Sequence, residues 1–301
     1  MVRARKMSFL RQSNSEKGFA VFNHLFMVFV VVICVYPVLH VIFASFSVPS
    51  LLMQHRGVLI RPLGFTLQGY SLVFANRSIM TGYLNTIFYV SVGTAVNLLL
   101  TSFGAYGLSR KNVMWRNLIM ILIVFTMFFS GGLIPLFLLV RSLGILNTRA
   151  AMIMPTAISA WNLIVMRTVV SMTIPDSLEE SAKIDGANDF VILFRIVLPL
   201  STAVLAVMAL FYGVGHWNQW FNAMLYLRSR ALYPLQLVLR EILITRDLTA
   251  MPIDQFTAGR EQYQELIKYA VIVVATVPIM CIYPFLQKYF VKGIMIGALK
   301  G

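Results

Sequence analysis

Five of the eleven acidic residues of this chain lie close together, between residues 171 and 199. They are Asp176, Glu179, Glu180, Asp185 and Asp189. Carboxylates in such a group can pair with a basic partner, or they can cap short helices in a solvated loop. The others precede the first apolar run or lie in a single later loop, residues 228–265. We therefore expect the chain to work through these two loops.

The histidine and glycine patterns do not indicate an enzyme. His24, His40, His55 and His216 are scattered, without an H-E-x-x-H spacing or a nearby carboxylate, so we expect packing or interface roles rather than ligands or bases. The phosphate-loop pattern G-x-x-x-x-G-K-[ST] is absent from the sequence. We predict no catalytic residue, no metal site and no cofactor in this chain, and any catalysis would come from a partner.

The composition indicates a membrane protein. Hydrophobic residues make up 59% of the 301 residues, charged residues only 12%, and the mean hydropathy is +0.80. A helix needs about 20 mostly apolar residues to cross a bilayer. Six stretches meet this requirement: 21–46, 83–104, 118–140, 151–170, 197–226 and 266–286. The expected fold class is therefore all-α, a multi-pass membrane protein with six transmembrane helices.

Several of these stretches contain amides, which indicate helices packed in a bundle because lipid cannot satisfy them. The polar and aromatic residues available to line a pathway or gate are Asn85, Asn97, Ser130, Asn162, Trp217, Asn218 and Trp220. The two tryptophans have a second interpretation as part of an aromatic belt at the membrane surface. Sequence alone leaves both open.

The net charge of +14 is explained by the membrane and gives no reason to expect nucleic acid. Basic residues precede the first span, crowd the loop after the second span and follow the last span, which places these flanks and both termini in the cytoplasm. They are Arg3, Arg5, Lys6, Arg11 and Lys17, then Arg110, Lys111 and Arg116, then Lys288, Lys292 and Lys300. The first apolar run is too long for a cleavable signal.

The polar segment 171–199 is expected to form two short helices joined by a turn. Asp176 and Ser177 each stand three residues before a glutamate, which is the capping-box pattern and predicts a helix start after Pro175. Gly186 suits the end of that helix, and Asn188 can cap a second helix over 189–198 that breaks near Pro199. The first helix would present Glu179, Glu180 and Lys183 to a partner. Ala182 and Ala187 would allow that partner a close approach.

The same residues carry a family resemblance. The sequence E-S-A-K-I-D-G-A at 180–187, followed by R-I-V-L-P at 195–199, resembles the E-A-A-x-x-D-G-A…L-P coupling loop of bacterial ABC-importer permeases. Ser181 stands where alanine is usual and Leu193 where phenylalanine is common. Residues 129–148, 166–189 and 283–301 are similar to maltose-type carbohydrate permeases, so the resemblance covers nearly the whole chain. It looks most like the branch that imports acidic polysaccharides and oligosaccharides, such as alginate or pectin fragments.

This resemblance implies a type-I ABC importer permease fold in the bacterial cytoplasmic membrane. The implied partners are a second permease subunit, two ATP-binding cassette subunits that bind ATP and Mg, and an extracytoplasmic solute-binding protein. Glu180 would meet a basic residue of the ATPase, Gly186 would allow the tight turn, and Asp185 would help to hold it. The coupling residues are Glu179, Glu180, Ala182, Asp185, Gly186, Ala187 and Pro199.

The resemblance also divides the chain. Residues 1–20 would be a basic cytoplasmic tail, 21–80 the first transmembrane helix and an external loop, 81–290 the transmembrane domain with its coupling loop at 171–199, and 291–301 a cytoplasmic tail. The loop 228–265, with a short helix expected over 233–244, corresponds to a segment that faces the binding protein. A solvated loop would have the same composition.

Other transport mechanisms fit the sequence less well. No carboxylate lies inside an apolar run, which disfavours a proton-coupled transporter, and no filter-like sequence indicates a channel. All ten basic residues placed outside are arginines, which suit uronate carboxylates, although docking to an acidic binding protein or simple solvation would also explain them. The alternative function is a membrane scaffold or receptor that recruits a cytoplasmic ATPase without transport.

Overall fold

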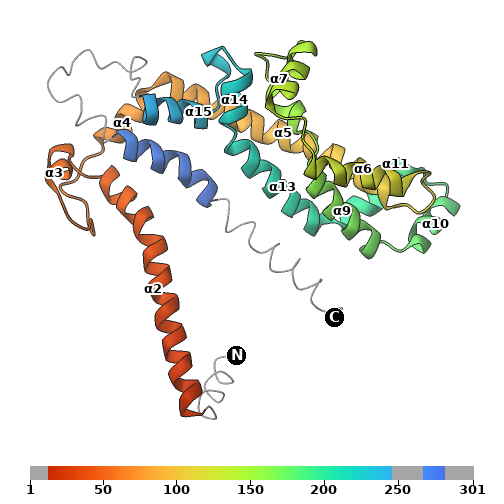
Figure 1. Ribbon diagram of the computed structural model, residues 1–301, viewed down its shortest axis with the longest axis horizontal. Coiled ribbons are helices and arrows are strands. Elements are labelled where there is room, and N and C mark those ends of the chain that lie inside the picture. Colours follow the sequence, from red (N-terminus) through yellow and green to blue (C-terminus); the bar gives the residue numbers. More distant parts are fainter. Residues whose placement is uncertain (1–12, 246–266, 282–301) are drawn as a thin grey trace. The chain divides into compact units, whose positions relative to one another are not determined.

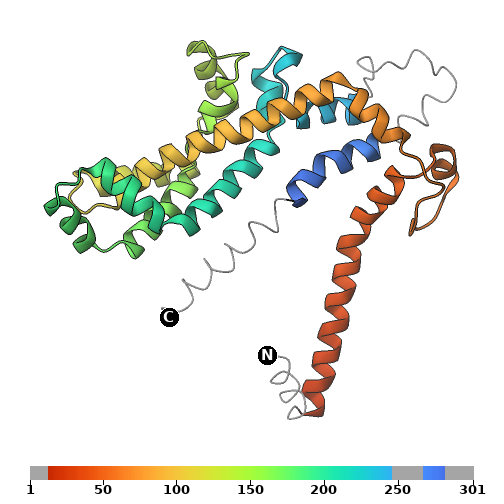
Figure 2. The same cartoon turned by 180° about the vertical axis from the view of Figure 1, so that it is seen from behind.

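The computed structural model describes residues 13–245 and 267–281, and within these ranges the regular elements are all helical. The expected all-α class is therefore confirmed. The chain divides into two compact units, one built from residues 1–73 and 254–273 and the other from 74–253 and 274–301. Figures 1 and 2 show the helices from opposite sides.

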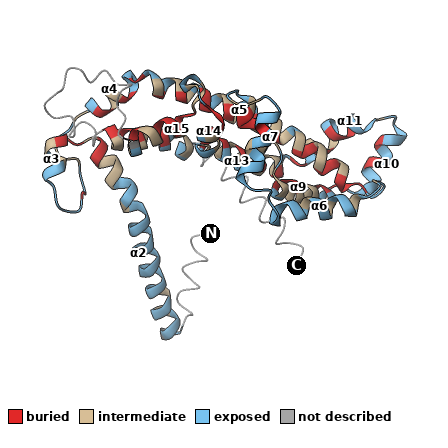
Figure 3. Cartoon of the chain, turned by 45° about the horizontal axis from the view of Figure 1, so that its top comes forward, coloured by how far each residue is buried: buried red, intermediate tan, exposed pale blue. Residues whose placement is uncertain are grey.

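The first unit contains α2 (Asn14–Ser45), α3 (Pro49–Gln54) and most of α4 (Gln68–Ala75). The apolar window of α2 has a mean hydropathy of 2.8, and none of it is buried within the chain, as the exposed colouring of Figure 3 shows. The loop after α2 folds back on its end: Leu63 N donates to Ser47 Oγ at 3.0 Å and Thr66 N donates to Phe46 O at 3.0 Å. These contacts close the loop before α4.

The second unit is organised around α5 (Arg77–Ser109), an unbroken helix of 33 residues. Asn76 caps it by accepting hydrogen bonds from the amides of Ser78 and Ile79. The other α-helices of this unit are α6 (Arg116–Phe128), α7 (Leu133–Ser142), α8 (Ala150–Ile153), α9 (Ala160–Thr173), α10 (Asp176–Ile184), α11 (Asp189–Ile192), α12 (Leu198–Leu200), α13 (Thr202–Trp217), α14 (Phe221–Tyr226) and α15 (Leu235–Arg240). In both views α13 runs beside α5, with α15 near one end of α5 and α10 near the other.

Three of the expected spans are each divided by a sharp bend. α6 and α7 meet at 116° across residues 129–132, where Gly132 has a φ of 87°. The segment Ala150–Thr156, which contains Pro155, meets α9 at 54°, and Asp189–Leu200 meets α13 at 85° just after Pro199. The spans expected over 118–140, 151–170 and 197–226 are therefore bent, because glycine and proline interrupt the backbone ladder there.

The described residues contain two unbroken helices long enough to cross a bilayer, α2 and α5, or five spans if each bent pair counts as one. The sixth expected stretch contains a shorter apolar helix, Ile267–Cys281, and the rest of it lies outside the described residues. The helix expected over 233–244 is present as α15, followed by a π-helical turn over Glu241–Thr245.

Polar side chains of α5 bind the backbone groups that the irregular segments leave free. Asn85 Nδ2 donates to the carbonyl oxygens of Ala231 and Tyr233, at 2.7 and 3.1 Å. Asn97 Nδ2 donates to those of Thr156 and Ala157, at 2.7 and 2.8 Å. The expected reason for amides in these spans, a packed bundle, is confirmed.

α5 and α13 approach closely at a glycine. A Cβ atom at Gly93 would lie 2.5 Å from Nε2 of His216, which is well inside van der Waals contact. His216 Nε2 lies 2.7 Å from Asn97 Oδ1, and it donates that bond because both Asn97 amide hydrogens are used by carbonyl groups. The small residue at position 93 therefore permits the buried bond between the two helices.

We expect Gly93→Ala to destabilise the bundle by about 2 kcal/mol, because the added methyl group must displace the imidazole from Asn97. Gly107→Ala is the matched control on the same helix, since a Cβ there meets nothing within 4 Å. It should leave stability unchanged or raise it by up to about 1 kcal/mol, because alanine favours the helix. Thermal unfolding of the detergent-solubilised proteins measures both, and equal melting temperatures would contradict the packing argument.

Candidate functional site

The polar segment 171–199 folds as two short helical arms, α10 and the stretch α11 to α12, which we call the elbow. α10 begins directly after Pro175, as expected. It ends at a turn in which Gly186 has a φ of 82°, Gly186 N donates to Lys183 O at 3.0 Å and Ala187 N donates to Ala182 O at 2.9 Å. These two bonds define a Schellman motif, which needs a left-handed residue at the glycine position. The predicted role of Gly186 in the turn is thus confirmed.

The second arm begins where the sequence predicts and contains an irregularity that it does not predict. Asn188 Oδ1 accepts from Val191 N at 2.9 Å and so caps α11. The arm continues as a π-helical turn over Leu193–Val197 and then as α12, and the chain bends at Ser201, two residues after Pro199. The expected break near Pro199 is confirmed.

The capping boxes expected at the start of α10 do not form. Pro175 occupies the cap position, and no side chain caps the helix. The carboxylate of Asp176 instead accepts from Lys111 Nζ at 2.6 Å, and Ser181 Oγ donates to Ser177 O. The helix starts as predicted because proline at the cap position cannot extend it backwards and acidic residues in the first turn favour its dipole.

Glu179 is not presented to a partner, contrary to expectation. Its relative exposure is 8%, and its carboxylate forms an ion pair with Arg110, which is 7% exposed and immediately follows α5. Arg110 is held in place because Nε donates to Ser109 Oγ at 2.9 Å and the guanidinium lies 5.1 Å from the ring centre of Tyr106. The expectation fails because the sequence does not reveal that the end of α5 brings a buried arginine to this face.

The ion pair is part of a small network. Lys183 Nζ donates to the other Glu179 oxygen at 2.7 Å and lies 3.7 Å from Asp189 Oδ1, and Tyr106 OH donates to Asp189 at 3.3 Å. Burial alone would raise the pKa of Glu179, but hydrogen bonds from Lys183 and Arg110 outweigh it and lower the pKa below the ordinary 4.5. The pair therefore stabilises the elbow at neutral pH, and this contribution is lost as acidification protonates Glu179.

The inner face of the elbow is part of the protein core. Ala182 is 8% exposed and packs in a cluster with residues of α5 and α9, and Ala187 is partly buried against the same cluster. The remaining buried members are Ala105, Tyr106, Leu108, Leu163, Met166, Val170, Ile174, Ile192, Leu193 and Val197. The expectation that the two alanines admit a partner is therefore wrong, since they admit the chain's own helices.

The outer face carries the side chains that the chain itself does not use. Glu180 and Asp185 are exposed, and in the described part of the chain neither carboxylate has a partner. Ile184, the neighbour of Asp185 in the sequence, is 86% exposed, whereas Phe190, although 65% exposed, meets Phe103 of α5 edge to face. Asp185 therefore does not close the turn through its carboxylate, because the backbone bonds do so. A mixed charged and apolar surface of this kind is typical of a protein contact.

A groove lies in the bundle at the break between the two parts of the fourth span. Its volume is about 290 Å³, and it is lined by Thr156, Ser159, Asn162, Phe211, Tyr212, Gly215, His216, Gln219 and Asn222. Tyr212 OH accepts from Ser159 N at 3.1 Å and shares a hydrogen bond with Thr101 at 2.8 Å. Gln219 Nε2 donates to Met152 O at 3.0 Å, and its Oε1 lies 3.1 Å from His216 Nδ1. The groove is thus supported by a connected polar network.

Of the expected pathway residues, only Asn162 lines this groove. Asn97 lies behind it, bonded to His216, and the Asn85 amide is bonded to the segment 231–233. Trp217 is 7% exposed and meets Tyr83 edge to face, while Trp220 lies 4.6 Å beneath the guanidinium of Arg240. Ser130 and Asn218 are exposed, and Asn218 Nδ2 donates to Val214 of its own helix. The structure therefore does not gather these seven residues into one site.

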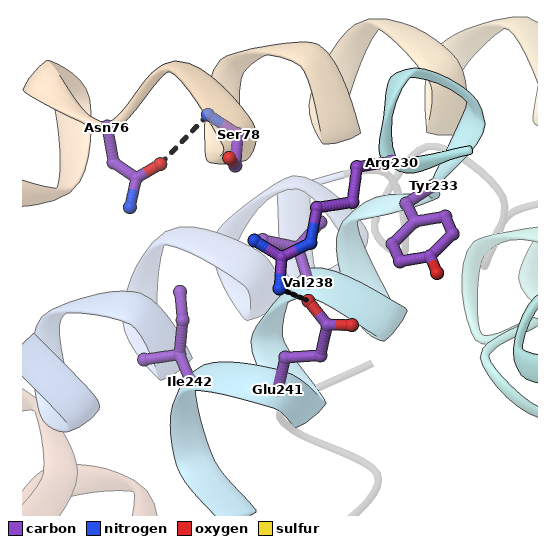
Figure 4. A pocket seen from close by; sticks show the side chains of 7 residues that line it. All are labelled: Asn76, Ser78, Arg230, Tyr233, Val238, Glu241 and Ile242. Atoms are coloured by element: carbon purple, nitrogen blue, oxygen red, sulfur yellow. Dashed lines mark hydrogen bonds and ion pairs between the residues drawn. The ribbon is translucent and has the colours of Figure 1, made fainter. Parts of the chain in front are cut away.

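A second hollow, formed by the start of α5 and by α15, is too small for a sugar. It has room for about 20 Å³, close to a single water molecule. Figure 4 shows its lining residues, with Arg230 lying 3.8 Å from Glu241. This hollow belongs to the packing between α5 and the segment after α14.

Sequence reasoning missed Arg110 as a site residue, and it missed most of the groove. In the sequence Arg110 is one of several basic residues in a short loop, and its pairing with Glu179 depends on the end of α5 meeting α10. Ser159, Tyr212, Gln219 and Asn222 come from segments that no motif connects. A usable signal was present in Pro155, since a proline in the fourth stretch indicates a break whose free carbonyl groups need polar neighbours.

Comparisons with known proteins agree with this architecture. Residues 97–296 match the family model described as "Binding-protein-dependent transport system inner membrane component". The chain is 45% identical, over 92% of its length and 96% of the relative, to the polygalacturonan/rhamnogalacturonan transport system permease protein YtcP of Bacillus subtilis. It is 29% identical, over 91% of its length and 94% of the relative, to an arabinooligosaccharide permease protein, AraQ, of Halalkalibacterium halodurans. A crystal structure of a bacterial ABC transporter involved in import of the acidic polysaccharide alginate matches with a TM-score of 0.86 and 32% identity, covering 93% of this chain and 99% of that one.

We expect Glu179→Gln to loosen the elbow, because it leaves the buried Arg110 guanidinium without its counter-charge, at a cost of about 3 kcal/mol. Hydrogen exchange of the amides of residues 176–186 measures this as faster exchange. Glu180→Gln is the matched control, a neighbouring glutamate on the exposed face, and it should leave exchange unchanged. Equal exchange in the two variants would contradict a structural role for the Arg110–Glu179 pair.

Proposed function

This chain belongs to the family of binding-protein-dependent transport system inner membrane components, and on that premise we propose that it passes uronate-containing oligosaccharides or polysaccharides inward, driven at the elbow by a cytoplasmic ATPase. It is a sugar permease of an ABC transporter, a membrane subunit without enzymatic activity, and separate ATPase subunits hydrolyse the ATP. The proposal concerns how the elbow couples, which partners assemble with the chain and which sugar it carries.

The observation that carries the coupling proposal is the division of the elbow into two faces. One face is fixed to the end of α5 through Glu179, and the other exposes Glu180, Ile184 and Asp185. A partner that binds the outer face would therefore act on the bundle through a buried ion pair. Two cytoplasmic ATPase subunits, one for each permease chain, are the proposed partners.

The proposed orientation rests on charge. Lys111 pairs with Asp176 at the base of α10, and Arg110 and Arg116 belong to the same short loop. A basic loop of this kind favours the cytoplasmic side of the membrane. The elbow would then face the cytoplasm together with both termini, and the segment 228–265 would face an extracytoplasmic binding protein. Residues 246–265 of that segment lie outside the described residues.

The proposed second permease chain rests on unused apolar surface. α6 has no buried residue, and only Val140 is buried in α7, although both helices are strongly apolar. Large exposed apolar patches in a helical bundle require lipid or another subunit. A single bundle of five or six spans also gives little room to enclose an oligosaccharide, so we propose a heterodimer of permease chains.

The acidic-sugar proposal rests on the two relatives that handle pectin-type and alginate polymers, and on the external arginines. Some of these arginines already have partners: Arg149 lies 4.4 Å above the ring centre of Phe88, and Arg240 lies above Trp220. Arg141 and Arg228 are exposed and leave guanidinium groups for a bidentate contact with carboxylates. The full external set is Arg56, Arg61, Arg77, Arg141, Arg149, Arg228, Arg230, Arg240, Arg246 and Arg260.

We expect Glu180→Lys to insert and assemble in the membrane but to lose sugar-stimulated ATP hydrolysis by about tenfold or more, because removing and reversing a charge at an interface commonly costs more than 1.4 kcal/mol. The assay uses the purified transporter in lipid nanodiscs with its loaded binding protein. Glu180→Gln should show a smaller loss. Full sugar-stimulated ATPase activity in Glu180→Lys would refute the coupling role of this residue.

We expect proteoliposomes with the complete transporter to import trigalacturonate more than about tenfold faster than a neutral trisaccharide, because a bidentate arginine contact to a carboxylate adds a charge-assisted bond. The advantage should shrink as salt is raised, since exposed charges are screened. Equal import of the two sugars would contradict the proposed acidic substrate class, but it would not contradict sugar transport.

A further inference from the structure

The short loop between α5 and α6, residues 110–116, carries basic and large apolar side chains beside an exposed apolar helix. α6 begins at Arg116, and none of its residues is buried within the chain. Its first large apolar side chains, Leu118 and Ile119, are exposed within one helical turn of the loop. Because α6 together with α7 is a candidate membrane span, the loop that precedes α6 lies at the level of the lipid headgroups.

Two large side chains of this loop are held in solvent by the chain itself. Met114 is 78% exposed and Trp115 is 64% exposed. Trp115 has a left-handed backbone, with a φ of 64°, which is unfavourable for a bulky residue, and no side chain caps α6 there. An indole that stays exposed at a cost in backbone free energy indicates a partner outside the described part of the chain. Tryptophan, with an apolar ring and an N–H donor, is enriched at membrane interfaces.

The loop has a positive charge that the chain neutralises only in part. Arg110 pairs with Glu179, and Lys111 Nζ donates to Asp176 at 2.6 Å. Arg116 has no carboxylate partner among the described residues, and its Nη1 donates instead to the carbonyl oxygen of Arg110 at 3.4 Å. The side chain of Lys111 is highly exposed, so its ammonium group can donate to a second anionic group beside Asp176. The surface therefore suits an anion that approaches from the membrane side.

We propose that the loop 110–116 binds the headgroups of anionic phospholipids. Lys111 and Arg116 donate to phosphate oxygens, and Trp115 and Met114 lie at the boundary between the headgroups and the acyl chains. An anionic headgroup such as that of phosphatidylglycerol is favoured over a zwitterionic one, because it brings no cation that would oppose the basic side chains. Coverage of the loop by a protein subunit is the alternative, and it gives a different experimental result.

Lipid binding at this loop has a consequence for the elbow. Arg110 and Lys111 are both paired with carboxylates of α10, so the loop and α10 are joined at two places. A headgroup bound to Lys111 and Arg116 restrains the segment from which both ion pairs are made. Anionic lipid therefore stabilises α10 in its position against the end of α5. This role does not depend on which sugar the transporter carries.

The first test measures lipid contact in the complete transporter in nanodiscs, with Cys34 and Cys281 replaced by serine and with cysteine-free partner subunits. Met114→Cys is labelled with a bimane fluorophore and quenched by phospholipids that carry a nitroxide near the headgroup. Spin-labelled phosphatidylglycerol should quench at about a fifth of the mole fraction that spin-labelled phosphatidylcholine requires, because one basic residue at a membrane surface contributes about fivefold. The preference should disappear in Arg116→Gln and should fall in high salt.

Two other positions provide the controls for this experiment. Arg195→Gln removes the same charge from an exposed arginine of the second arm, and it should leave the lipid preference unchanged. Ile184→Cys places the label at the exposed far end of α10, where neither lipid should quench it. Equal quenching of the Met114 label by both lipids would show that the loop does not recognise charge. Quenching by neither lipid would show that a protein subunit covers the loop, and both results overturn the proposal.

The second test needs no label. Glycine adopts a left-handed backbone without strain, so Trp115→Gly removes the indole and relieves the backbone at the same time. In detergent without phospholipid, the variant transporter should therefore melt at or above the wild-type temperature. In nanodiscs that contain phosphatidylglycerol the order should reverse, with the wild type melting about 2 °C or more above the variant. Any other order contradicts the anchor, since lower stability in both media shows a packing role and no loss in nanodiscs shows that the indole binds no lipid.

Discussion

The need to satisfy backbone groups freed by broken helices governs the structure of the second unit. In a bilayer, each carbonyl that loses its helical partner must find another inside the protein. Asn85 and Asn97 of α5 meet this need, each by donating twice to carbonyl groups in an irregular segment. Because the donors stand on one continuous helix, the breaks are positioned by α5 rather than left free to drift.

Much of the architecture could be predicted from the sequence because it depends on local chemistry. Apolar stretches predict the helices, Pro175 and Gly186 predict the bounds of α10, and Asn188 predicts the cap of α11. The break near Pro199 was likewise predictable, whereas the bend at 129–132 was missed because apolar composition continues across it and hydropathy does not record backbone direction. The glycine and proline residues were the only local sign.

The features of the candidate site that depend on a local sequence motif could be predicted, whereas those that depend on tertiary contacts could not. Glu179 and Glu180 are identical neighbours in sequence, yet one is buried against Arg110 and the other is exposed. Only the docking of α10 on the end of α5 distinguishes them, and that contact joins residues 69 positions apart. The groove was even harder to predict from the sequence, because its lining residues come from separate segments before and after the elbow.

The uninterrupted course of α5 has a mechanical consequence. At 1.5 Å per residue, its 33 residues extend over about 50 Å, with the segment 231–235 fastened near the beginning and α10 fastened at the end. No proline interrupts this helix. A displacement at its contact with 231–235 or with α10 therefore moves the whole helix as a rigid body, because the helix has no kink at which it could bend. The two opposite extremities of the bundle are therefore obliged to change position in step.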